Sequence, residues 1–163
     1  MNPPPDIEAF FGPGGLLSRS LPGWEHRPEQ QRMALAVARA IAQNDVCLVE
    51  AGTGVGKTLG YLVPAILSGR KTVVATGTRT LMAQVMEKEI PFLREVLGIP
   101  FTSALLKGRS NYLCLQRLET AQDHPDLFQG IEASLRRRIR AWAATTETGD
   151  FVEWTDEPES QGA

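Results

Sequence analysis

The sequence has few cysteines and no long apolar run, and each shortage excludes a class of protein. Only two cysteines occur in 163 residues, too few for the disulfide framework of a small secreted domain. The longest apolar run, residues 61–67, is far shorter than the roughly 20 residues that a membrane-spanning helix needs. The N-terminal residues carry neither a basic nor an apolar segment, so no secretory signal is visible. We therefore expect a soluble, cytoplasmic chain that contacts no membrane.

The net charge is small, and the charged residues are unevenly distributed. The net charge is −2, but six of the 19 acids follow Thr146, where no base occurs. The preceding residues therefore carry 17 bases against 13 acids. Such a modest excess permits nucleic-acid binding without arguing for it, because nucleic-acid binders usually have a much stronger basic footprint. With 42% hydrophobic and 22% charged residues, the composition is that of one ordinary globular domain.

Proline and glycine recur through the first 25 residues, which we therefore expect to be an irregular leader. Its apolar pieces, residues 7–11 and 16–17, are candidates for anchoring it to a core. From Pro28 the pattern turns helical, with apolar residues recurring every fourth position, until a turn at residues 44–45.

Short apolar runs then alternate with helical patterns. Residues 46–49 and 72–75 predict buried parallel strands, and residues 101–106 are a candidate third strand. Helices are predicted up to about residue 67 and over 80–97, the latter bent or interrupted at Pro91. This order predicts an α/β domain with a parallel sheet and flanking helices. Further on, residues 107–119 are predicted to be partly helical and 131–144 helical.

The strongest chemical signal is the segment AGTGVGKT, which follows the first predicted strand and opens the next helix. Glycines let the backbone turn N–H groups towards a phosphate, and the helix N-terminus adds its dipole. Lys57 is suited to reach the β- and γ-phosphates, and the Thr58 hydroxyl to hold Mg²⁺. Ala51 replaces the usual first glycine. The segment predicts a nucleoside triphosphate site comprising Ala51, Gly52, Thr53, Gly54, Val55, Gly56, Lys57 and Thr58.

Two other interpretations of this loop exist. A glycine-rich turn that binds nothing is the simpler one, although it does not account for the flanking strand and helix. A dinucleotide fingerprint is excluded by the spacing, because Lys57 stands where the last glycine of G-x-G-x-x-G is required.

Four segments together resemble the DinG/XPD group of iron–sulfur superfamily 2 DNA helicases, and bacterial DinG-like helicases in particular. HRPEQQRM, at residues 26–33, resembles their Q-motif region, and VEAGTGVGKTLGYLVPAI, at 49–66, resembles motif I. VVATGTRTLMAQV, at 73–85, is similar to motif Ia. LLKGRSNYLC, at 105–114, resembles the segment that delivers the first cysteine of their [4Fe-4S] cluster. The likeness covers about residues 10–120.

The resemblance implies a fold, domains and residue roles. Residues 26–106 would form the first part of a P-loop NTPase (RecA-like) domain, incomplete here, and 107–163 the start of an inserted iron–sulfur domain. The whole protein would couple ATP hydrolysis to 5′ to 3′ translocation on single-stranded DNA, in repair or replication. The implied site residues are Gln30 and Arg27 for adenine, Lys57 and Thr58 for phosphate and Mg²⁺, Thr78, Lys107 and Arg109 for DNA, and Cys114 for the cluster.

Several of these residues have simpler interpretations. Without the resemblance, Gln30 is better explained as a residue of an exposed first helical turn. Thr78 is typical of a helix N-cap, a role compatible with DNA contact. Cys47 is predicted to be a buried strand residue. The arginines at 136–140 fit a solvated helix face at least as well as a DNA contact, and packing is the expected role of the three tryptophans.

Parts of the family pattern are missing. A [4Fe-4S] cluster takes four cysteines, and Cys114 has none after it. No D-E-A-H motif occurs, and the segment before Asp156 and Glu157 is too polar for the usual buried strand. We therefore expect an N-terminal fragment whose own ATP hydrolysis is severely impaired. The alternatives are a non-catalytic nucleotide-binding P-loop fragment and a small regulatory ATPase.

Overall fold

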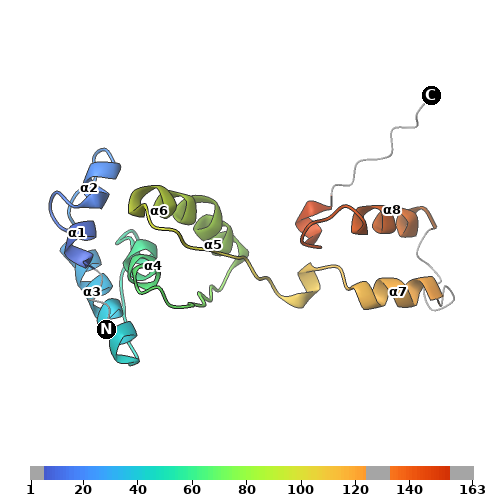
Figure 1. The fold of residues 1–163 in the computed structure, drawn as a ribbon, viewed down its shortest axis with the longest axis horizontal. Helices are drawn as coiled ribbons and strands as arrows, with labels where there is room; N and C mark the ends of the chain where they lie inside the picture. Colours follow the sequence, from blue (N-terminus) through green and yellow to red (C-terminus); the bar gives the residue numbers. More distant parts are fainter. Residues whose placement is uncertain (1–5, 124–132, 155–163) are drawn as a thin grey trace. The chain divides into compact units, whose positions relative to one another are not determined.

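The computed structural model describes residues 6–123 and 133–154 of the chain (Figure 1). The chain divides into two compact units, Met1–Leu105 and Leu106–Ala163, called here the first and second unit. Residue 131, where a helix is predicted to begin, and the Asp156–Glu157 pair lie outside the described residues. No helix among the described residues is long and apolar enough to cross a membrane.

The first unit begins with two short helices, α1 (Ile7–Phe11) and α2 (Leu16–Ser20). The Asp6 side chain caps α1 by accepting a hydrogen bond from the backbone N–H of Ala9 at 2.9 Å. Ile7, Phe10, Phe11 and Leu17 are each at most 2% exposed and belong to the hydrophobic core. The segment expected to be an irregular leader therefore has two helical turns and supplies large core side chains.

The next two helices, α3 (Pro28–Gln43) and α4 (Lys57–Leu67), begin and end where the sequence predicts. Asn44 ends α3 in the left-handed conformation, at φ 54°, which asparagine tolerates better than most residues. The two helices pack closely at Gly60, where a Cβ would lie 3.1 Å from the sulfur of Met33. This packing fixes α4, and hence the loop before it, against α3.

The predicted helix over 80–97 is one continuous run with an irregular middle. It comprises α5 (Arg79–Gln84), a π-helical turn η1 (Val85–Glu89) and α6 (Ile90–Leu97). Pro91 has no N–H and its ring crowds the preceding turn, so the regular ladder cannot pass through it. The predicted interruption is confirmed, and the irregular turn lies just before the proline.

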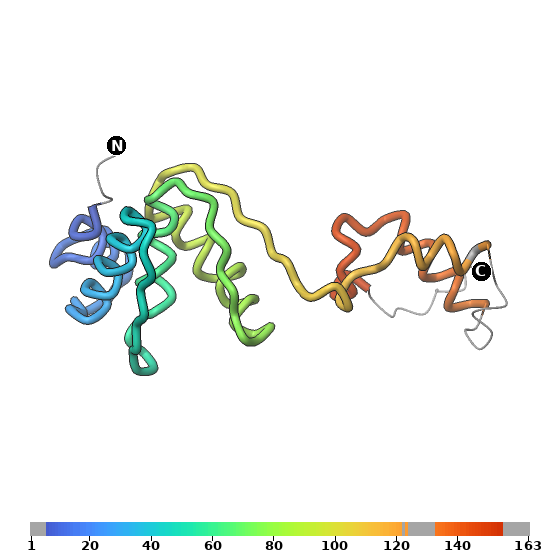
Figure 2. Tube along the Cα trace, turned by 90° about the horizontal axis from the view of Figure 1, so that it is seen from below, coloured from blue at the N-terminus to red at the C-terminus, as the bar shows by residue number. Residues whose placement is uncertain are grey.

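The described residues contain no β-strand, so the predicted sheet is not formed in them. Residues 46–49, 72–75 and 101–106 run as extended chain without ladder partners (Figure 2). Val46, Leu48 and Val73 are 91%, 98% and 90% exposed, and Cys47 is exposed instead of buried. A parallel strand is stable only when neighbouring strands accept its hydrogen bonds and helices cover both faces. The local sequence therefore favours an extended backbone in these segments, but it does not supply the neighbouring strands with which they would pair.

The described residues of the second unit include two helices and two short 3₁₀ turns. They are η2 (Arg109–Asn111), α7 (Leu115–Asp123), α8 (Ala133–Ala143) and η4 (Phe151–Glu153). An isolated antiparallel bridge joins Tyr112 to Asp150. Trp142 stacks on Phe151 with ring centroids 5.7 Å apart and meets Trp154 edge to face at 5.4 Å. Packing, as predicted, is the role of both tryptophans.

Candidate nucleotide-binding site

The phosphate-loop segment is a tight turn that leads directly into α4. Gly54 and Gly56 have φ angles of 78° and 82°, a region that side chains with a Cβ rarely adopt. Gly56 is the N-cap of α4, and no side chain caps this end of the helix. The first turn of α4 therefore presents backbone N–H groups that have no partner among the described residues, which is the usual arrangement for binding an anion.

Two side chains from the start of α3 hold the loop by its carbonyl groups. Arg27 donates from Nη1 to the carbonyl oxygen of Gly54 at 2.6 Å. Gln30 donates from Nε2 to the carbonyl oxygen of Gly56 at 2.9 Å. The structure thus brings both predicted adenine residues to the predicted phosphate loop, although 26 positions separate Gln30 from Gly56.

Gln30 is not the exposed helix residue of the simpler interpretation. It is only 2% exposed, and its Oε1 atom is buried without a hydrogen-bond partner in the described residues. A buried amide oxygen without a donor normally costs about 1–3 kcal/mol. This oxygen is therefore a buried acceptor whose hydrogen-bonding capacity is unused in the described residues.

The Lys57 ammonium lies over the start of the same loop. Nζ donates to the carbonyl oxygens of Ala51 and Gly52, at 2.9 and 2.6 Å, and the side chain is exposed. Next to it, burial raises the pKa of the Tyr61 phenol, while a hydrogen bond with the Thr58 side chain acts in the opposite direction. Tyr61 is therefore neutral at pH 7, and its phenol lies within reach of the Thr58 hydroxyl.

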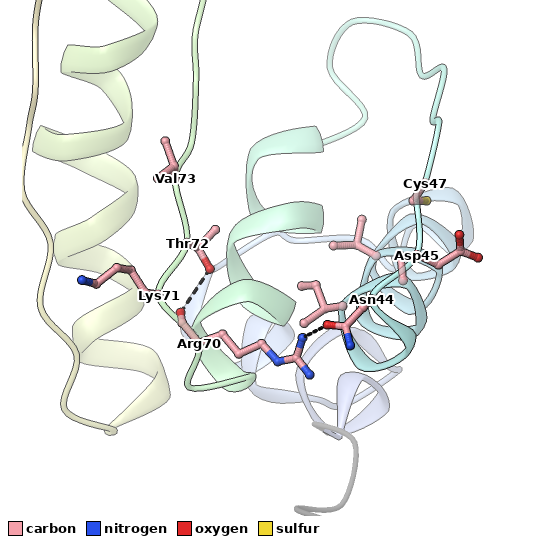
Figure 3. Close-up of a pocket in the computed structure, with 10 residues that line it drawn as sticks. Asn44, Asp45, Cys47, Arg70, Lys71, Thr72 and Val73 are labelled. Carbon is pink, nitrogen blue, oxygen red and sulfur yellow. Dashed lines mark hydrogen bonds between the residues drawn. The ribbon is translucent and has the colours of Figure 1, made fainter.

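A separate cavity of about 470 Å³ lies away from the phosphate loop, at the C-terminal end of α3 (Figure 3). Arg70 bridges its two walls by donating to the Oδ1 atom of Asn44 at 2.5 Å. The other walls come from extended residues, including Cys47 and Val73. This cavity is the space beside two unpaired extended segments, and it brings together none of the predicted site residues.

Thr78 begins α5 as its N-cap, and its Oγ1 atom accepts a hydrogen bond from the N–H of Leu81 at 3.2 Å. The predicted capping role is therefore confirmed. A hydroxyl has one donor and two acceptor positions, so capping leaves its proton available. Thr78 is exposed and can still donate to a ligand.

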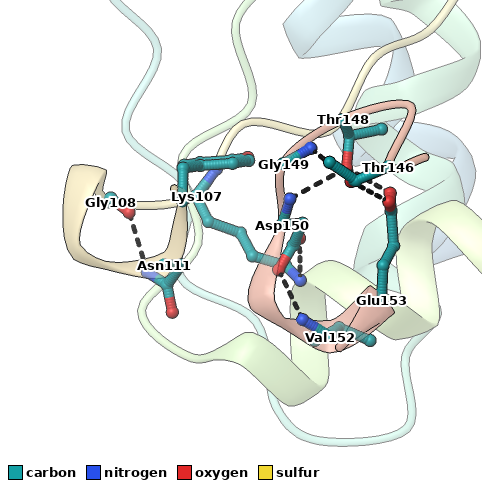
Figure 4. Close-up of polar contacts among 10 residues, drawn as sticks. Lys107, Gly108, Asn111, Thr146, Thr148, Gly149, Asp150, Val152 and Glu153 are labelled. Atoms are coloured by element: carbon teal, nitrogen blue, oxygen red, sulfur yellow. Dashed lines mark hydrogen bonds and ion pairs between the residues drawn. The ribbon is translucent and has the colours of Figure 1, made fainter. Parts of the chain in front are cut away.

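In the second unit, Lys107 is tied to Asp150 instead of being presented to solvent. The two side chains form an ion pair and are 13% and 12% exposed (Figure 4). The backbone N–H of Lys107 also donates to the Tyr112 hydroxyl at 2.8 Å, and that of Leu113 to the Gly149 carbonyl at 2.8 Å. These contacts fasten residues 107–113 to the turn that ends in η4.

Cys114 follows this fastened segment and is exposed. Cys47, the other cysteine of the chain, belongs to the first unit. Nowhere in the described ranges do three or more His, Cys, Asp or Glu side chains gather so that they could hold a metal ion. The residues present therefore do not fit a four-cysteine iron–sulfur cluster.

Sequence reasoning missed the role of Asp150, which it counted only among the six acids that follow Thr146. Asp150 is 9% exposed, pairs with Lys107, and caps η4 by accepting from the N–H of Val152 at 3.1 Å. Its position after Gly149 and before an apolar pair is the local signal of a capped turn. Its partner, 43 positions earlier, has no local signal.

Residues 28–149 match the DEAD/DEAH box helicase family. The chain is 40% identical over 147 residues to the ATP-dependent DNA helicase YoaA of Haemophilus influenzae, covering 90% of this chain and 23% of the relative. It is 40% identical over 149 residues to the ATP-dependent helicase DinG of Mycobacterium tuberculosis, covering 78% and 22%. It is 37% identical over 154 residues to the 3′–5′ exonuclease DinG of Bacillus subtilis, covering 91% and 16%.

The chain thus spans less than a quarter of the length of each of these relatives. No solved structure matches it.

Proposed function

The chain belongs to the DEAD/DEAH box helicase family, and from that premise we propose that it is the N-terminal part of an ATP-dependent DNA helicase. The likeness to helicases named YoaA and DinG supports this proposal. The whole protein would hydrolyse ATP and move 5′ to 3′ along single-stranded DNA, in repair or replication. Residues 26–106 would be the start of its RecA-like motor domain and 107–163 the start of the inserted domain.

The observation that carries the proposal is the loop at residues 51–58, held by α3 and followed by uncapped N–H groups of α4. These N–H groups and the Lys57 ammonium would bind the phosphates of ATP. The buried Oε1 atom of Gln30 would accept from the amino group of adenine. Arg27 would hold the loop in shape through the Gly54 carbonyl.

Thr58 is the residue that would hold Mg²⁺, and its partner Tyr61 would orient its hydroxyl. When bound, Mg²⁺ would neutralise charge on the phosphates. The sequence contains no D-E-A-H motif to complete the magnesium site and orient water. We therefore propose that the isolated 163-residue chain binds nucleotide but turns it over very slowly, which is also the behaviour of the non-catalytic alternative.

Two exposed residues would contact DNA. Thr78 keeps a hydroxyl proton available beside its capping bond, and Arg109 is exposed at the start of η2. Lys107 would act differently, because its ammonium is occupied by Asp150. We propose that Lys107 positions the segment that carries Arg109 and Cys114.

Titration of the 163-residue chain with a fluorescent ATP analogue tests the proposal. We expect saturable binding that competes with ATP, and a loss of at least about tenfold in affinity in Lys57→Ala, because the ammonium contacts phosphate directly. Lys88→Ala is the matched control, since Lys88 is an exposed lysine of η1 outside the loop. Equal affinity in all three proteins, or rapid DNA-stimulated turnover by this chain, would contradict the proposal.

A further inference from the structure

Helix α8 carries an arginine face that the proposed function does not use. Arg136, Arg137 and Arg140 follow Ala133 at the i+3, i+4 and i+7 spacing that places residues on one face of a helix. Together with Ala121 of α7, these residues line an open cavity of about 350 Å³. Arg137 and Arg140 are exposed, and Arg136 is half-buried.

The orientation of this face is fixed by packing on the other side of α8. Arg138 lies over the Trp154 ring, with its guanidinium carbon 5.4 Å from the ring centroid. Trp142 stacks on Phe151 and meets Trp154 edge to face. Rotating α8 to hide its arginine face would break these aromatic contacts. The arginines at 136, 137 and 140 are therefore held together as a set.

These three guanidinium groups have no acidic partner among the described residues. Neither ion pair of the described ranges includes them, and α8 itself contains no acid. The second unit is acidic overall, with seven bases and ten acids, so carboxylates are plentiful in it. Two of its acids are already engaged, Asp150 by Lys107 and Glu153 by Thr146 and Thr148. The N–H donors of these three guanidinium groups are therefore open to an anion from outside the unit.

The geometry points to a phosphate ligand with more than one charge. The planar fork of a guanidinium matches phosphate in a bidentate contact, and three forks lie within about 6 Å of helix rise. We propose that Arg136, Arg137 and Arg140 bind the sugar–phosphate backbone of single-stranded nucleic acid. This inference rests on the proposed helicase function and adds a contact surface beyond residue 114, where the recognised motifs end.

The experiment measures binding of the 163-residue chain to a fluorescein-labelled 20-mer of deoxythymidine by anisotropy, at several salt concentrations. Arg136→Gln, Arg137→Gln and Arg140→Gln are combined in one variant. We expect its affinity to fall at least about tenfold at 50 mM salt, because three phosphate contacts are lost. The slope of log affinity against log salt should shrink by about 2, at roughly 0.7 per phosphate contact.

A charge-matched control combines Arg19→Gln, Arg32→Gln and Arg39→Gln, three exposed arginines of the first unit outside the loop. It should keep the wild-type salt slope, because the inference assigns no phosphate contact to these three arginines. Far-UV circular dichroism checks that each variant keeps its helices. If the triple variant unfolds, Arg137→Gln alone, at an exposed position, should still reduce the slope by about 0.7.

The inference is overturned by the absence of binding to the wild-type chain, by equal salt slopes in wild type and α8 variant, or by equal losses in the control. If poly-glutamate at equal charge displaces the DNA, the ligand of the arginine face is an acidic polypeptide and not a nucleic acid. That result would overturn the inference too. ATP-analogue binding is measured in the same samples. Loss of DNA binding with nucleotide binding retained would leave the proposed function standing, so the two failures are distinguishable.

Discussion

At the residue scale, Asp150 and Lys107 show how one long-range ion pair organises a small unit. Both side chains are nearly buried, and neither was predicted to pair. Asp150 also bridges to Tyr112 and caps η4. A buried ion pair of this kind contributes little to stability relative to an apolar pair of the same shape. Removal of one partner, however, leaves the other charge buried and unpaired.

Asp150→Asn should destabilise the second unit by about 3 kcal/mol, because it leaves the Lys107 ammonium buried without a counter-charge. The asparagine keeps the side-chain oxygen that caps η4, so the loss reports the ion pair. Urea unfolding followed by tryptophan fluorescence measures it. Asp123→Asn, at an exposed position on α7, is the matched control and should change stability by less than about 0.5 kcal/mol. An equal effect of both substitutions would rule out the assigned role.

Glu153 gives a pH-dependent prediction at the same scale. Hydrogen bonds from the Thr146 and then the Thr148 side chain lower the pKa of its carboxyl group below the usual 4.5. A lowered folded-state pKa adds stability above the unfolded-state pKa, and that stability is lost as pH falls through the folded-state value. The thermal midpoint of Glu153→Gln should therefore lie below that of wild type at pH 7 and approach it at pH 3. A pH-independent difference would contradict this.

At the element scale, the phosphate loop is held by the helix before it and continued by the helix after it. The local pattern predicted α3, the loop and α4, because caps, glycines and apolar periodicity all lie within a few residues of each boundary. The pattern did not predict that Gln30 would donate to Gly56. That contact depends on α3 packing against α4, which periodicity indicates only as an apolar face.

The contact between Gln30 and Gly56 predicts that alanine substitutions at Gly54 and Gly56 differ in their effect on stability. Gly54→Ala meets no atom within 4 Å and should cost only about 1–2 kcal/mol for its left-handed backbone. Gly56→Ala has the same backbone strain, and its Cβ would also lie 2.1 Å from Nε2 of Gln30, which is buried and cannot move without losing its bond. Gly56→Ala should therefore destabilise the chain more and weaken ATP-analogue binding more.

Adding Gln30→Ala to each glycine variant completes the test. It should recover part of the stability lost in Gly56→Ala and none of that lost in Gly54→Ala, because only the first variant has the clash. Urea unfolding of the four variants measures the coupling. Equal behaviour of the two glycines would show that Gln30 does not hold the loop.

At the scale of the whole molecule, helices form without the sheet that the sequence predicts between them. The core of the first unit consists of helix side chains, including Phe10 and Phe11 from the segment before residue 26. The extended segments pass beside this core with most of their apolar side chains exposed. Exposed, unpaired extended chain is a hazard for association, because its N–H and carbonyl groups are open to another chain.

Hydrogen exchange measures this division between helices and extended chain. Amides of residues 47–50 and 72–75 have no backbone acceptor in the part of the chain that the structure describes, and they should exchange at close to the unstructured rate. Amides in the middle of α3 and α4 should be protected by orders of magnitude, because their helical bonds are covered by the core. Strong protection of residues 47–50 in a monomeric sample would contradict the absence of strand pairing.

The sequence by itself determined the features whose causes are local. These are the bounds of α3 and α4, the glycine loop between them, the interruption of the helix near Pro91 and the capping by Thr78. Tertiary structure alone decided which distant groups meet, such as Gln30 with Gly56 and Lys107 with Asp150. It also decided that extended segments stay unpaired. The physical reason is that caps and periodicity act over a few residues, whereas an ion pair or a sheet needs partners from distant positions.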